Sequence, residues 1–123
     1  MENKHKNPEK IWVLAKKWMW LTVAYIVYCE TNSDCTIVHM ENGDDHLVSG
    51  NLSETERLID SDDFFDIHQT YRVNLNYWDG TKVATSDRLL GLTTGVKLPV
   101  ADRKLAKLRA ELRIRKDKNS QQQ

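Results

Sequence analysis

Short apolar stretches separated by polar turn residues are the feature that most constrains how this chain folds. The stretches at 11–13, 18–22, 26–30 and 35–40 are rich in β-branched and aromatic residues, which favour strands. Asn42-Gly43 then supplies one of the strongest hairpin signals that a sequence can carry, with a returning strand over 45–49. The first half of the chain is therefore predicted to be a series of short, mostly antiparallel strands.

The second half adds helices to this pattern. A mid-chain helix is predicted from Asn51, because Glu54 follows at the spacing of a capping box. Alternation predicts a strand over 73–77, and a second hairpin joins 88–92 to 96–100. A basic helix over 102–115 closes the domain, with Leu105, Leu108 and Leu112 at helical spacing. The fold class is a β-rich α+β domain over 10–115, with a flexible lead over 1–9 and a disordered tail over 116–123.

Length and composition narrow the class of protein further. The chain has 123 residues, 40% hydrophobic and 29% charged, which fits one globular domain. Its two cysteines form neither a disulfide scaffold nor a zinc motif, so a reducing, cytoplasmic location is expected. The apolar stretch 11–29 contains Lys16 and Lys17 and favours strands, so we interpret it as core, with no membrane contact. Its tryptophans are expected to pack in a sheet, with base stacking a distant alternative: Trp12, Trp18 and Trp20.

Charge is distributed unevenly along a chain whose net charge is zero. Residues 1–29 carry five Lys/Arg against two Asp/Glu, residues 30–66 one against eleven, and residues 67–123 twelve against five. Such blocks suggest a polyanion partner for the second half or a basic partner for the acidic middle. Interleaving of the blocks in the folded domain would cancel much of this asymmetry. No glycine-rich phosphate loop or hydrolase motif occurs, so neither an enzyme nor a cofactor is expected.

Residues 63–78 carry the most characteristic pattern of the chain, Asp-Phe-Phe-Asp-Ile-His-Gln-Thr-Tyr-Arg-Val-Asn-Leu-Asn-Tyr-Trp. The Phe-Phe, Ile-His and Val-Asn steps resemble the LytTR DNA-binding domain of bacterial response regulators. The hydrophobic run 23–30 ending in Glu30, the Asn42-Gly43 hairpin, the segment 50–58 and the Leu98-Pro99-Val100 strand follow in the family's order. The resemblance covers roughly residues 10–112.

The resemblance implies an elongated arrangement of short antiparallel sheets whose loops enter successive major grooves of double-stranded DNA. It also implies a transcription regulator of two-component systems that acts on paired direct repeats, with a homodimer on the DNA as one arrangement. This chain has no receiver domain, so it is either a stand-alone regulator or the output domain of a longer protein. The alternative is a degenerate interaction module that uses the acidic region 30–66.

Three places match the family's base-contact positions. The first is the loop with Asn32, Ser33 and Cys35, although a plain solvated turn is equally consistent with it. The second is Gln69, whose amide can pair with adenine N6 and N7. The third is Arg103, which suits guanine or a phosphate. The family usually carries Ser-Arg here, whereas this chain has Ala101-Asp102-Arg103, which weakens any phosphate contact at that position.

Further residues are predicted to position the DNA backbone or to support the loops. Arg72, Lys97, Lys104 and Lys107 are the candidate phosphate contacts, with solvated charges as the alternative. His68 and Asn74 are predicted to support the loop that presents Gln69. His39 and His46 flank a hairpin, but the spacing supplies no third ligand, so no metal site is expected.

Overall fold

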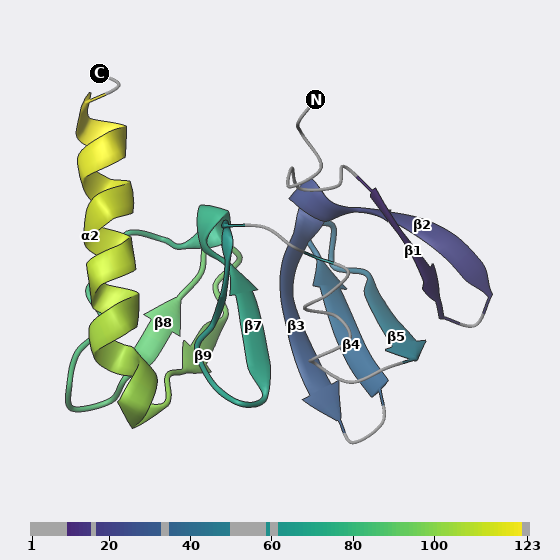
Figure 1. The fold of residues 1–123 in the computed structure, drawn as a ribbon, viewed down its shortest axis with the longest axis horizontal. Coiled ribbons are helices and arrows are strands. Elements are labelled where there is room, and N and C mark those ends of the chain that lie inside the picture. Colours follow the sequence, from purple (N-terminus) through teal and green to yellow (C-terminus); the bar gives the residue numbers. More distant parts are fainter. Residues whose placement is uncertain (1–9, 16, 33–34, 50–58, 60–61, 122–123) are drawn as a thin grey trace.

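The computed structural model describes residues 10–15, 17–32, 35–49, 59 and 62–121, and shows three antiparallel sheets and a C-terminal helix (Figure 1). The strands are β1 Lys10–Leu14, β2 Trp18–Thr22, β3 Ile26–Asn32, β4 Cys35–Met40, β5 Asp45–Ser49, β6 Phe64–Asp66, β7 Tyr71–Asn74, β8 Leu89–Gly91 and β9 Lys97–Pro99. The helices are the 3₁₀ turns η2 Val23–Tyr25, η3 Leu75–Tyr77 and η4 Asp102–Lys104, and α2 Leu105–Gln121. The predicted β-rich α+β class is confirmed.

The central sheet has five strands in the order β5-β4-β3-β7-β6. The β4–β5 hairpin turns where the sequence predicts it, with Gly43 at φ 95° and the Asp44 amide donating to Asn42 Oδ1 over 2.9 Å. A side chain at φ 95° would be strained, so glycine suits the turn. The antiparallel pairing of β3 with β7 thus places the C-terminal end of β3 next to the β6–β7 connection.

The β1–β2 sheet uses its two faces differently. Ile11, Val13 and Leu21 are buried in a core cluster with residues of the central sheet, whereas the tryptophans lie on the opposite face. Trp12, Trp18 and Trp20 remain 45%, 54% and 60% exposed, and the rings of Trp12 and Trp18 stack with centroids 5.8 Å apart. The interpretation of this whole stretch as core is therefore wrong for the tryptophans.

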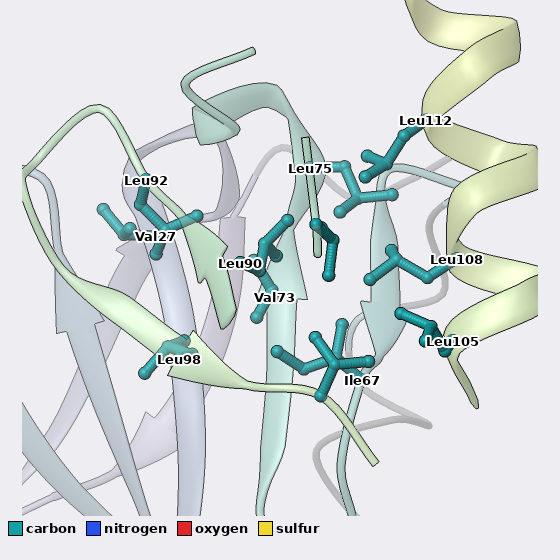
Figure 2. Close-up of a cluster of buried hydrophobic side chains, with 12 residues drawn as sticks. Val27, Ile67, Val73, Leu75, Leu90, Leu92, Leu98, Leu105, Leu108 and Leu112 are labelled. Atoms are coloured by element: carbon teal, nitrogen blue, oxygen red, sulfur yellow. The ribbon is translucent and has the colours of Figure 1, made fainter. Parts of the chain in front are cut away.

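The closing helix packs as its leucine spacing predicts. Leu105, Leu108 and Leu112 are buried and point towards Leu75 and Ile67 in the second core cluster (Figure 2). The helix continues beyond Arg115 to Gln121, so residues 116–121 are helical rather than the disordered tail that the sequence predicted. The three buried leucines therefore fix the first turns of the helix to the sheets, next to the candidate contacts.

Two other predicted elements differ or lie outside the described residues. The predicted strand 73–77 stops at Asn74, because Asn74 Oδ1 accepts the Asn76 amide over 3.0 Å and caps the 3₁₀ turn η3. The predicted mid-chain helix from Asn51 lies outside the residues that the structure describes. Within the described part of the chain, no helix has both the length and the apolar character needed to cross a membrane.

Cys29 makes the core sensitive to alkaline pH. Its side chain in β3 is fully buried, and this burial raises the pKa of the thiol from 9.0 to about 12. The unfolded chain therefore loses this proton at a lower pH than the folded chain. The contribution of Cys29 to the free energy of unfolding is thus fully present below pH 9 and is lost as pH rises towards 12.

We expect Cys29→Ala to remove this part of the pH dependence. Between about pH 8.5 and pH 10, the wild-type chain should lose about 1 kcal/mol more unfolding free energy than the variant. Urea unfolding at both pH values measures the difference. Tyr28 and Tyr77, whose pKa values are also raised by burial, add the same trend to both proteins. Parallel pH profiles for the two proteins would contradict the prediction.

Candidate nucleic-acid interface

Three segments that are distant in sequence meet at one edge of the molecule. The end of β3, the loop 67–70 and the start of the closing helix all lie at the lower edge in Figure 1. Two backbone hydrogen bonds join them: the Thr31 amide donates to Thr70 O over 2.9 Å, and the Ala101 amide donates to Ile67 O over 2.7 Å. The predicted base-contact segments therefore form one continuous edge.

The loop 67–70 is a tight turn that presents Gln69. The Tyr71 amide donates to His68 O over 3.1 Å, and the Thr70 amide donates to His68 Nδ1 over 3.1 Å. Because Nδ1 accepts, the neutral ring carries its proton on Nε2. Gln69 at the tip is exposed, whereas its neighbours are half-buried. His68 thus holds the backbone of the loop, and the Gln69 amide is free to reach outwards.

The β3–β4 connection is described only at its two ends. Asn32 pairs with Cys35 in the strand register, and Thr31 Oγ1 donates to Cys35 O over 3.4 Å. Cys35 is half-buried at the start of β4. Ser33 and the side chain of Asn32 lie outside the described residues, so their predicted base contacts stay predictions.

The 3₁₀ turn η4 carries Arg103 at the same edge. Ala101 provides no side-chain cap, and Asp102 stands in the first turn. The Asp102 carboxylate faces Arg88, with 3.7 Å between Oδ1 and Arg88 Nη1. Arg103 is exposed and, among the described residues, has no carboxylate partner. The negative charge of Asp102, which departs from the family's usual sequence, is thus partly offset by the positive charge of Arg88. Arg88 was not identified as a candidate from the sequence.

The candidate phosphate contacts separate into two groups. Lys104 and Lys107 follow Arg103 on the closing helix, with Lys107 exposed and Lys104 half-buried. Lys97 is exposed at the start of β9, one strand length before this turn. The hydrogen bonds from Thr81, together with the charge of Lys97, lower the pKa of Asp79. Lys104 and Lys107 therefore share the edge with Arg103, whereas Lys97 lies farther along.

Arg72 is not a surface cation, and its predicted phosphate contact is wrong. Its side chain is buried, with Nη1 2.7 Å from Asp66 Oδ1 and Nη2 donating to Ile59 O over 3.1 Å. The guanidinium carbon also lies 5.9 Å from the centre of the Phe64 ring. Arg72 in β7 therefore contacts both Asp66 in β6 and the backbone of Ile59.

Asn74 is structural, but it supports a different place from the predicted one. Its Nδ2 donates to Ile26 O over 3.0 Å, and its Oδ1 caps η3. These contacts lie at the end of β7 opposite to the loop of Gln69. The expected support of that loop by Asn74 is therefore corrected, whereas His68 contacts it directly.

Acidic side chains of the middle region make internal contacts with His39. His39 Nδ1 lies 2.7 Å from Asp45 Oδ1, His39 Nε2 lies 2.7 Å from Glu30 Oε1, and its ring stacks on Tyr28 with centroids 4.2 Å apart. His46 pairs with Val38, so the two histidines do not face each other. Among the described residues, no group of three His, Cys, Asp or Glu side chains is arranged to hold a metal ion.

Comparison with known proteins identifies the family of this chain. The family model of the LytTr DNA-binding domain matches residues 16–113. The chain belongs to the LytTR family. It is therefore a DNA-binding domain of transcription regulators, a family of binding domains rather than enzymes, and its partner is DNA.

A solved structure has the same fold as this LytTR chain. It is described as the LytTr DNA-binding domain of a putative methyl-accepting/DNA response regulator from Bacillus cereus. The identity is 22%, the TM-score is 0.69, and the match covers 85% of this chain and 96% of that one. No curated protein sequence matches the chain.

Proposed function

We propose that this LytTR chain is a sequence-specific regulator that recognises paired direct-repeat half-sites through loops in the major groove. The observation that carries the proposal is the joining of the loop 67–70 to β3 and to the helix start by two backbone hydrogen bonds. A rigid edge of this kind holds short polar side chains at fixed spacing, as base recognition requires.

Among the proposed base contacts, Gln69 and Arg103 are the two whose side chains are exposed in the described residues. Both are exposed at the edge, and each can form a bidentate pair: the Gln69 amide accepts from adenine N6 and donates to N7, whereas the Arg103 guanidinium donates to guanine O6 and N7. The loop with Asn32, Ser33 and Cys35 would contact the next part of the groove. Two copies on neighbouring half-sites would supply the second set of contacts.

A selection from random duplexes at about 150 mM salt tests this function, followed by anisotropy titration of the enriched sites. We expect two short motifs in the same orientation, spaced by about one helical turn or more. Binding that shows no enriched motif and disappears with modest salt would contradict the proposal, because it would be only the non-specific electrostatic component.

Lys104→Gln and Lys107→Gln are expected to weaken binding to all duplexes alike. Each lysine is proposed to neutralise one phosphate, so each substitution should lower the slope of log K against log salt by about 1. Anisotropy titrations over a range of salt concentrations measure this slope. Lys10→Gln, on the exposed side of β1, is the matched control and should leave the slope unchanged. A loss confined to one DNA sequence would contradict the backbone role.

A further inference from the structure

A basic pocket lies beside the second half of α2. Its cavity of about 280 Å³ is lined by one aromatic ring, an apolar floor and four cations, mainly Trp78, Leu112, Lys82, Arg109, Arg113 and Lys116. No Asp or Glu lines it. The lining therefore combines a planar apolar surface with positive charge, which suits an anionic ligand.

The helix contribution follows from its periodicity. Arg109, Leu112, Arg113 and Lys116 stand at positions i, i+3, i+4 and i+7, so they share one face of α2. Arg109 joins this face to the preceding loop, because its Nη2 donates to Val83 O over 2.7 Å and to Thr85 Oγ1 over 2.8 Å. One wall of the pocket is thereby fixed against the other.

Trp78 is also held in place. Its indole N–H donates to Thr81 O over 2.9 Å, and the side chain is half-buried. In contrast, Lys82, Arg113 and Lys116 are exposed, and within the described ranges no carboxylate forms an ion pair with any of them. The Trp78 ring is therefore already ordered before a ligand binds, which lowers the entropic cost of binding against it.

We propose that this pocket binds a small organic anion with one planar aromatic ring, an aromatic carboxylate or an aryl phosphate. The ring would lie against Trp78 and Leu112, and the anionic group would contact Arg113 and Lys116. The volume lies near the lower end of the range for small-molecule pockets, which suits a ligand with a single ring.

The site is separate from the DNA edge. The residues at 109–116 lie in the middle turns of α2, whereas the loop 67–70 and the start of the helix lie at the lower edge in Figure 1. Occupation of the pocket would therefore leave Gln69 and Arg103 accessible.

Titration of the full chain with four probes, followed by ¹H–¹⁵N spectra, tests the proposal. Benzoate and phenyl phosphate should shift the Trp78 indole N–H and the amides of 109–116 with saturation, and their relative affinities identify the preferred anion. Acetate, which lacks the ring, and benzyl alcohol, which lacks the charge, should produce no saturable shift at the same concentrations. Equal effects of acetate and benzoate would overturn the proposal, as would the absence of any saturable shift.

Substitutions locate the site and separate it from DNA binding. Arg113→Gln and Lys116→Gln should each weaken the better aromatic anion about tenfold, the loss of one charge-assisted contact. Lys107→Gln, at another position on the same helix, is the matched control and should leave that affinity unchanged. If Arg113→Gln and Lys116→Gln instead weaken duplex binding as much as Lys104→Gln does, the face contacts the DNA backbone and the proposal is wrong.

Discussion

Replacement of Arg72 by Met is expected to lower the free energy of unfolding by about 3 kcal/mol. The substitution removes a buried guanidinium and leaves Asp66 without its ion-pair partner and Ile59 O without its donor. Loss of one member of a buried pair costs about 3–5 kcal/mol, and the lower value applies because the Asp66 side chain keeps 26% of its surface in water. Urea unfolding measures the change.

Arg88→Met is the matched control for this prediction. The Arg88 pair with Asp102 is longer, at 3.7 Å, and both side chains are exposed, so the expected loss is below about 1 kcal/mol. At a temperature at which Arg72→Met is still folded, its DNA affinity should have the wild-type salt slope. Unchanged stability together with a lower salt slope would restore Arg72 as a phosphate contact.

The strands and hairpins were predictable because their signals are local. Asn42-Gly43 fixes the β4–β5 turn through its own backbone conformation, and the leucine spacing marks the buried face of α2. The order of the strands in the central sheet was not predicted, because no local pattern states that β7 pairs with β3.

The errors at individual side chains concern properties that depend on distant partners. In β1, both Ile11 and Trp12 are apolar, so alternation alone does not tell which face the core covers. The burial of Arg72 depends on Asp66 and Ile59, which the fold brings together. Asn74 similarly acts on Ile26, which is remote in sequence. Arg88 was missed because its place next to Asp102 follows from the β8–β9 pairing and not from any motif.

The double variant Gln69→Ala, Arg103→Ala is expected to lose most of the sequence preference of the domain. Each side chain is proposed to contact a different base pair, and a lost bidentate contact costs about 1–3 kcal/mol. Costs at separate positions add approximately, so the pair should lose about 2–6 kcal/mol on the selected duplex. Specific binding usually exceeds non-specific binding by about 4–10 kcal/mol, so the variant should approach its affinity for random DNA.

Anisotropy titration of the selected duplex and of a scrambled duplex measures this loss directly. The affinity for the scrambled duplex should fall little with Gln69→Ala, which removes no charge, and more with Arg103→Ala, because a cation near phosphates contributes to all sequences. Thr93→Ala, an exposed position in the β8–β9 turn, is the control and should bind both duplexes as the wild type does. Each single variant should relax the preference at one base pair only. If Gln69→Ala leaves the ranking of sites unchanged, the loop 67–70 does not recognise bases, and specificity has to come from the loop with Asn32 and from Arg103.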